Sequence, residues 1–337
     1  MKSKLLIAAA VVIATLISQS ASTAPMPQPS AHTKGFPTGK TTGPLKPGEY
    51  WWNPNVSPAG PVVVLVSLPL QTMHVYRNGI LVGRTSISSG TKGHKTPTGV
   101  FTILEKKQTH RSSTYNDAPM PNMQRLTWSG IAMHSGNLPG YPASHGCIRM
   151  PYDFSTLLFG ITGNGGTVVI GDDTKAQPRF AANPGVILAP KDFTPDMLKS
   201  LAKGEFQWNP ERSTSGPITM LVSAADKTLY VYRNGEPIGR AAIEVNGKLG
   251  GHVFTLLDGV TAADSALVPG RPARIWMSVQ SDAASRSTDV AALAQRVRIS
   301  PEFAGKVYDT LKPGATLIVT DQPIVRKASR DFTILAD

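Results

Sequence analysis

The chain of 337 residues contains a single cysteine, Cys147, which follows a histidine and a glycine in the segment "YPASHGCIRMP". A cysteine thiolate is a strong nucleophile, but a free thiol with a pKa of ~8.5 is only slightly ionised at neutral pH. A histidine within hydrogen-bond reach can take the thiol proton and later return it to a leaving amine. His134 and His145 are the candidates for this role, and the sequence does not decide between them.

Two other uses of the cysteine compete with nucleophilic chemistry. A free cysteine is often a small buried hydrophobe. A metal site could combine Cys147 with His134 and His145, but structural zinc takes four ligands and the other nearby side chains are weak ligands. We therefore expect no metal.

The N-terminus is typical of a secretory signal. Lys2 and Lys4 precede an apolar run, and small residues follow it, which predicts a signal peptide over residues 1–24. The run is too short to cross the ~30 Å of bilayer hydrocarbon. We expect an exported protein of the periplasm or cell wall, with no membrane span after signal cleavage. In an oxidising compartment a lone cysteine cannot form a disulfide within its own chain.

The formal charge of +12 suggests affinity for a polyanion. Nucleic-acid binding would require clustered basic residues with interleaved aromatic residues. The basic residues are scattered along this chain, so we expect no nucleic-acid partner. Anionic polymers of the cell envelope, or a solvated basic surface without a specific partner, agree better with export.

An internal repeat organises the rest of the chain. "LKPGEYWWNP" from Leu45 returns as "LAKGEFQWNP" from Leu201, and "VYRNGILVGR" from Val75 returns as "VYRNGEPIGR" from Val231 at the same offset. A later stretch aligns "IRMPYDFSTLLFGI" from Ile148 with the residues from Val297. The predicted parts are a signal peptide (1–24), a Pro/Gly/Ser-rich linker (25–44), a first domain (45–172), a linker with a short helix near 191–203 (173–200), a second domain (201–320) and a C-terminal tail (321–337).

Within each unit the pattern is mostly that of β-strands. Runs such as "VVVLVS" and "GTVVIG" are rich in β-branched residues, and Asn78 with Gly79 forms a common hairpin-turn pair. The segment "YDFSTLLFGI" has apolar residues at helical spacing. A mainly β fold with short helices is predicted for both units.

The second copy shows which residues the fold can lose. Cys147 aligns with Arg296 and His145 with Ala294, while Arg149 persists as Arg298. His134, Ser144 and Gly146 are also replaced in the second unit. Because these residues are lost together, we interpret them as a chemical set and the second copy as catalytically degenerate.

The segments "MHSG", "SHGCIRMP" and "KTPTGVF" resemble the signature of the L,D-transpeptidase (YkuD-like) catalytic domain. The resemblance covers residues 45–172, with residues 201–320 as a degenerate YkuD-like unit. It implies two tandem domains of a β-sandwich type. It also implies action on peptidoglycan, in cell-wall biogenesis and the maintenance of cell shape.

The family resemblance implies a role for each residue of the set. Cys147 would be the nucleophile and His134 the general base, and backbone N–H groups around Gly146 and Cys147 would form an oxyanion hole. Arg149 could bind a substrate carboxylate through its planar fork. The positions that match the supporting residues of the family motif are Ser135, Ser144 and His145.

The implied reaction expels the terminal D-alanine of a peptidoglycan stem peptide and transfers the acyl group to a second amine, giving a 3-to-3 cross-link. The resemblance also implies that the reaction needs no cofactor and that carbapenem-type inhibitors acylate Cys147. The alternatives are an L,D-carboxypeptidase, an amide hydrolase acting on wall-linked peptides, and a non-catalytic peptidoglycan-binding protein. Residues 110–128 form a long polar connection that could cover the cleft as a lid or be a plain surface loop. The sequence gives no oligomeric state.

Overall fold

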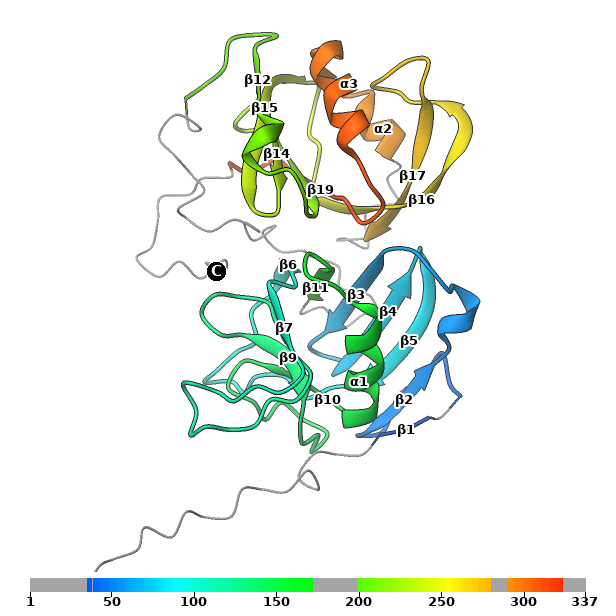
Figure 1. Ribbon diagram of the computed structural model, residues 1–337, viewed down its shortest axis with the longest axis vertical. Helices are drawn as coiled ribbons and strands as arrows, with labels where there is room; N and C mark the ends of the chain where they lie inside the picture. The colour runs from blue at the N-terminus through cyan, green and yellow to red at the C-terminus, as the bar shows by residue number, and fades with distance from the viewer. Residues whose placement is uncertain (1–34, 38, 172–198, 280–289, 324–337) are drawn as a thin grey trace, which may run out of the picture.

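The computed structural model describes residues 35–37, 39–171, 199–279 and 290–323 (Figure 1). The predicted signal peptide, residues 25–34 of the first linker, most of the second linker and most of the C-terminal tail lie outside the described residues. So does the greater part of the helix predicted near 191–203, and its described end, residues 199–203, is not helical. No helix within the described ranges has the length and apolarity that a membrane span requires.

The first unit contains two sheets and one helix. The larger sheet has seven strands in the order β1-β2-β5-β4-β3-β11-β6, and the smaller has four in the order β10-β9-β8-β7. Helix α1 (Tyr152–Ile161) follows β10, as the apolar spacing predicted. The strands are β1 (Phe36–Pro37), β2 (Glu49–Trp52), β3 (Val62–Ser67), β4 (Thr72–Arg77), β5 (Ile80–Ser86), β6 (Gly99–Thr102), β7 (Glu105–Lys107), β8 (Met123–Arg125), β9 (Ala132–Ser135), β10 (Ile148–Met150) and β11 (Thr167–Gly171).

The second unit is built on one large sheet with the order β12-β15-β14-β13-β19-β16-β17, and β18 pairs with β15 beside this path. From β12 to β16 this order repeats that of β2 to β6 in the first unit. Its elements are β12 (Phe206–Trp208), β13 (Ile218–Ser223), β14 (Thr228–Arg233), β15 (Glu236–Val245), β16 (His252–Asp264), β17 (Pro272–Val279), α2 (Val290–Ala294), β18 (Val297–Ile299), α3 (Pro301–Thr310) and β19 (Thr316–Thr320).

The predicted mainly β class is therefore confirmed. The Asn-Gly hairpin turns also lie where expected, between β4 and β5 and between β14 and β15, with Asn78 and Asn234 both in the left-handed region. Two short 3-10 helices, Pro54–Val56 and Pro210–Arg212, occupy matching positions after β2 and β12.

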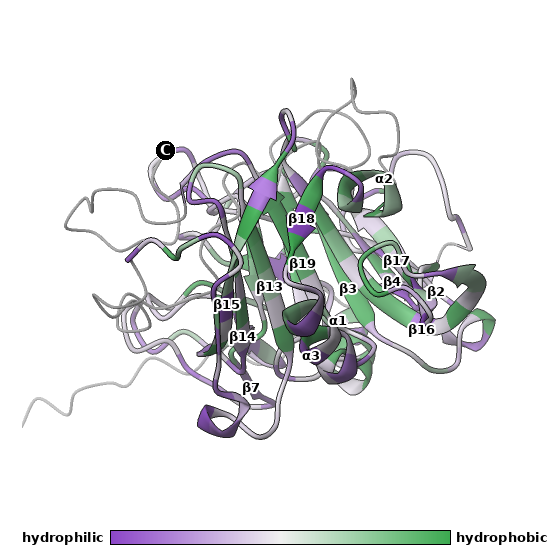
Figure 2. Cartoon of the chain, turned by 90° about the horizontal axis from the view of Figure 1, so that it is seen from above, coloured by the Kyte–Doolittle hydropathy of each residue, from purple (hydrophilic) through white to green (hydrophobic). Residues whose placement is uncertain are grey.

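The central strands of the large sheet in each unit are apolar on both faces. Along β3, Val64 and Val66 face the core of their own unit, while Val63 and Leu65 face a second cluster shared with the other unit. Strands that are buried on both faces form continuous apolar runs of this kind. Figure 2 shows this hydrophobic character along β3, β13 and β19.

The shared cluster joins the two large sheets face to face (Figure 1). Thr167 Oγ1 and Thr316 Oγ1, which occupy the same place in β11 and β19, lie 2.9 Å apart and share a hydrogen bond. The shared cluster consists of Val63, Leu65, Val100, Val169, Leu221, Tyr230, Tyr232, Val253 and Ile318, with Tyr76 and Met277 packed against it. The two units therefore meet through corresponding strands.

A buried arginine fixes the start of each unit. Arg84 on β5 donates a hydrogen bond to the carbonyl of Gly43, and Arg240 on β15 donates one to the carbonyl of Lys199 at 2.7 Å. Arg84 Nε also donates to His74 Nε2 at 3.1 Å. This contact requires a neutral His74, because a protonated imidazole has no acceptor nitrogen.

The pairing of His74 with Arg84 predicts a loss of stability in mild acid. Burial and the adjacent Arg84 charge lower the pKa of His74 from 6.5 to about 4. As the pH falls below 6.5 the unfolded chain takes up the proton first, so stability present above that pH is lost toward pH 4. The loss should approach about 3 kcal/mol.

Urea unfolding at several pH values measures this effect. His74→Tyr, which introduces the residue found at the matching position Tyr230, should flatten the stability profile between pH 6.5 and 4. An unchanged slope in the variant would show that other groups cause the acid sensitivity.

Candidate active site

Two parallel strands place the candidate nucleophile and base together. Strand β10 pairs with β9 in a register that sets Arg149 opposite His134 and Ile148 opposite Met133. Side chains alternate between the faces of a strand, so Cys147, two residues before Arg149, lies on the face that carries His134. Ile148 and Met133 point the other way, into the core of the unit.

The hydrogen bond of His134 defines its neutral form. His134 Nδ1 lies 2.7 Å from the carbonyl oxygen of Ser135, and the side chain is buried. A carbonyl only accepts, so Nδ1 carries the hydrogen and Nε2 carries the lone pair. Ser135 is held in turn by its own N–H, which donates to the carbonyl of Pro121 at 3.0 Å. The ring therefore has the tautomer that a general base requires at Nε2.

Cys147 lies in a mostly apolar setting. Its side chain packs against a small cluster formed by Met120, Met123 and Ala132, and Sγ lies 3.8 Å from the carbonyl oxygen of Gly130. Burial raises the pKa of the thiol, although the Ala132 backbone and nearby arginines oppose the shift. The resting residue is thus a thiol rather than a thiolate, and its chemistry depends on a base.

The raised pKa of Cys147 predicts slow alkylation of the free protein at neutral pH. The rate of reaction with iodoacetamide should rise with pH and reach its midpoint above the ordinary pKa range of a free thiol. Mass spectrometry can follow the reaction without interference, because the chain has no second cysteine. A midpoint below neutral pH would mean that Cys147 rests as a thiolate.

A serine clasp shapes the turn before the nucleophile. Ser144 Oγ donates to the Cys147 carbonyl at 2.6 Å and accepts from the Gly146 N–H at 3.1 Å. Gly146 has φ of 108°, in the region that favours glycine, and a Cβ there would collide with Ile131. Because the Gly146 N–H donates to Ser144 Oγ, it could donate to an oxyanion only if this hydrogen bond were broken.

Thr96 is a further support that the sequence reasoning did not single out. Its Oγ1 donates to the Gly146 carbonyl at 2.8 Å and accepts from the Gly90 N–H at 2.8 Å. Thr96 is buried and belongs to the segment "KTPTGVF". The presence of Thr96 in a segment that resembles the family signature was the sequence signal that could have identified its supporting role.

Arg149 joins the two sheets of the unit. Its backbone N–H and carbonyl both bond to Ser88, just beyond β5, while β10 pairs with β9 on the other side. The aliphatic part of its side chain lies over Gly136. Partial burial lowers the pKa of the guanidinium, which nevertheless stays charged. Its place opposite His134 agrees with a role in binding an anionic group.

His145 contacts other aromatic rings at the surface. It is exposed and stacks on Tyr115 with ring centroids 4.5 Å apart, and His94 lies 4.7 Å from it on another side. Tyr115 belongs to the connection between β7 and β8, so this connection reaches the active-site turn. The stacking favours a positioning role for His145 over a role as base.

The connection that carries Tyr115 is braced by an internal ion pair and is anchored to α1 at its C-terminal end. Arg111 forms an ion pair with Asp117 at 2.8 Å. The Asn122 side chain donates to Ser155 and Thr156 on α1 at 3.0 and 2.9 Å. Together with Met120, which packs against Cys147, these contacts place the connection over the cysteine.

Within the described ranges, no group of three or more His, Cys, Asp or Glu side chains is arranged to hold a metal ion.

Residues 61–170 match the family model of YkuD, the L,D-transpeptidase catalytic domain. The chain therefore contains a YkuD domain. The match includes the candidate nucleophile, the candidate base and the serine clasp, and it confirms the resemblance inferred from the sequence for these residues. No curated protein matches the chain.

Solved structures of L,D-transpeptidases are similar to part of the chain. One from Stackebrandtia nassauensis is 28% identical over 34% of this chain and 57% of its own, with a TM-score of 0.31. One from Xylanimonas cellulosilytica is 28% identical over 33% and 61%, with a TM-score of 0.30. L,D-transpeptidase 3 from Mycobacterium tuberculosis, in complex with a faropenem-derived adduct, is 22% identical over 34% and 61%, with a TM-score of 0.32. The chain thus spans about three fifths of each of these structures.

Proposed function

We propose that the protein is an exported L,D-transpeptidase that remodels peptidoglycan through an acyl-enzyme on Cys147. The observation that carries the proposal is the placement of the only thiol of the chain on the same strand face as His134, whose Nδ1–H is bonded to Ser135. The YkuD domain over residues 61–170 supports a transpeptidase-type reaction.

In the first half of the proposed reaction, His134 Nε2 takes the proton of the Cys147 thiol. The sulfur attacks the carbonyl at the L-centre of the third stem residue and forms a tetrahedral oxyanion. The Cys147 N–H is the proposed donor to that oxyanion, because the Gly146 N–H is bonded to Ser144. The intermediate then expels D-alanine, whose amine takes the proton from His134, and a thioester remains.

In the second half, an amine from another stem attacks the thioester carbonyl. His134 removes a proton from that amine, the C–S bond breaks, and the sulfur recovers its proton. The product is a 3-to-3 cross-link. The proposed role of Arg149 is to hold a carboxylate of one stem, and the proposed roles of Ser144 and His145 are to fix the turn around Cys147 and the connection above it.

Water in place of the second amine would make the protein a carboxypeptidase or an amide hydrolase. The partly buried setting of Cys147 beneath Met120 favours transfer to an amine, because exclusion of water protects a thioester from hydrolysis. A purely binding protein would have no use for an intact set of thiol, base and serine clasp.

Incubation with purified disaccharide tetrapeptides tests the proposal. Chromatography should show free D-alanine together with cross-linked dimers of the substrate. D-alanine without dimers would identify the carboxypeptidase alternative. If a folded protein with a reduced thiol gives neither product, the proposal is contradicted.

A further inference from the structure

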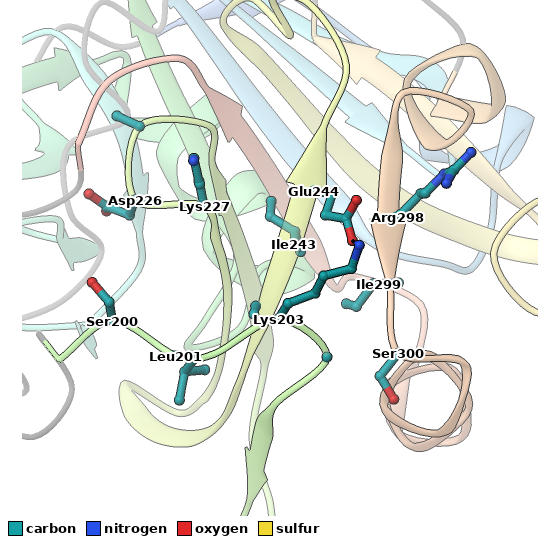
Figure 3. A pocket seen from close by; sticks show the side chains of 13 residues that line it. Ser200, Leu201, Lys203, Asp226, Lys227, Ile243, Glu244, Arg298, Ile299 and Ser300 are labelled. Carbon is teal, nitrogen blue, oxygen red and sulfur yellow. Dashed lines mark ion pairs between the residues drawn. The ribbon is translucent and has the colours of Figure 1, made fainter.

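The second unit contains a pocket to which no role has yet been assigned. It has a volume of about 490 Å³ and lies between the start of the unit, the turn that joins β13 to β14, and strands β15 and β18 (Figure 3). Leu201, Ile243 and Ile299 supply apolar lining. Charged side chains surround them, so the pocket combines an apolar floor with a polar rim.

The same position in the first unit is filled by protein. Glu244 pairs with Arg298 as Ser88 pairs with Arg149, so the two places correspond in strand register. Ser88 is fully buried, whereas the Glu244 side chain is 48% exposed. A segment of the chain therefore covers Ser88 in the first unit, and no described segment of the second unit covers Glu244 to the same extent.

The cover in the first unit is a bend of the active-site loop at Gly140 and Tyr141, where Gly140 has φ of 94°. The carbonyl of Tyr141 accepts a hydrogen bond from Ser88 Oγ at 2.8 Å. A Cβ on Gly140 would lie 2.9 Å from Cγ of Pro47, so the loop also rests on the start of the unit. In the first unit this position thus holds a short peptide segment of its own chain, bonded to Ser88 and resting on Pro47.

The second unit has gained charges at the uncovered positions. Lys203 stands where the first unit has Pro47, and Lys227 stands where it has Gln71. Asp226 and Glu244 replace Leu70 and Ser88. With Arg298, the rim carries three cationic and two anionic side chains.

Two of the cationic side chains are not occupied by ion pairs. Lys203 Nζ lies 2.8 Å from Glu244 Oε1, and Figure 3 shows these side chains meeting near the middle of the pocket. Lys227 lies on one side and Arg298 on the other. Neither forms a close ion pair in the described part of the chain, although Arg298, on the facing strand, helps to lower the pKa of Glu244. The rim can therefore attract carboxylates on both sides of a bound peptide.

We propose that this pocket is a second binding site of the protein, and that it takes a short peptide bearing carboxylates, of the stem-peptide type. The stem-peptide identity rests on the proposed function. Two peptide sites on one chain keep a polymeric substrate attached while the YkuD domain acts on one of its stems.

The test uses the full chain with Cys147→Ala, so that no substrate is consumed, and a disaccharide tetrapeptide that carries a photoreactive diazirine. After irradiation, mass spectrometry should find adducts near Lys227 and Arg298 in addition to adducts in the YkuD domain. Lys227→Glu with Arg298→Glu should reduce the adducts in the second unit by about tenfold. Lys248→Glu with Lys312→Glu makes the same charge change at exposed positions outside the pocket and should leave these adducts unchanged.

A probe with amidated carboxylates should label the second unit about tenfold less than the acidic probe. The inference fails if the adducts are confined to the YkuD domain, or if charge reversal at the pocket has no more effect than the control pair. D-alanine release by the chain with Cys147 and the pocket intact separates the two proposals. Release by that chain, with no labelling of the pocket in the Cys147→Ala chain, overturns the second site alone, whereas labelling of the pocket without release by the intact chain overturns the transpeptidase.

Discussion

Replacing Cys147 by alanine should abolish D-alanine release, lowering the rate by at least about 10⁴-fold. The reason is chemical, because no other thiol in the chain can form the thioester. The fold should survive, since the side chain is small and only partly buried beside Met120 and Met123. Release assays with matched thermal unfolding curves make the measurement.

Cys147→Ser is the matched control for this prediction, because it keeps the size of the side chain and replaces the sulfur by a poorer nucleophile. It should also be inactive. Release of D-alanine by the alanine variant at more than a trace level would mean that the reaction takes another route, and that Cys147 serves packing alone.

Replacing His134 by glutamine should lower the rate of release by about 10²- to 10⁴-fold. Burial raises the pKa of the Cys147 thiol, so without a base few molecules hold a thiolate at neutral pH. The remaining activity should rise with pH as the thiol ionises. Rates measured from pH 6 to pH 10 would show this change of profile.

His145→Gln is the matched control for the His134 variant. His145 is exposed and stacks on Tyr115, so its loss should cost less than about tenfold, through the position of the connection above the cleft. A larger loss in the His145 variant than in the His134 variant would reverse the assignment of the base.

The sequence predicted the candidate catalytic residues better than it predicted the contacts that position them. The order Ser-His-Gly-Cys-x-Arg with an upstream histidine indicated the candidate set, because catalytic geometry restricts residue types at fixed spacing. The strand register that places His134 opposite Arg149 then required the structure. Thr96 and Tyr115 contact the turn from distant parts of the chain, and no local pattern encodes such contacts.

The packing of the units illustrates the same limit. The apolar run of β3 predicted a strand, and its lack of alternation was a signal of burial on both faces. It did not reveal that Val63 and Leu65 face the second unit rather than another part of their own. The sequence did not predict the pocket of the second unit either. In the first unit a loop covers Ser88, and within the described residues no segment covers Glu244 at the matching position.

Trapping the acyl-enzyme tests the central claim most directly. Wild-type protein is mixed with a disaccharide tetrapeptide, quenched in acid within seconds and analysed by intact-mass and peptide-mapping mass spectrometry. We predict an adduct equal to the substrate minus D-alanine, located on the peptide that contains Cys147. A chain that releases D-alanine with no adduct on Cys147, or with the adduct on another residue, would contradict this account.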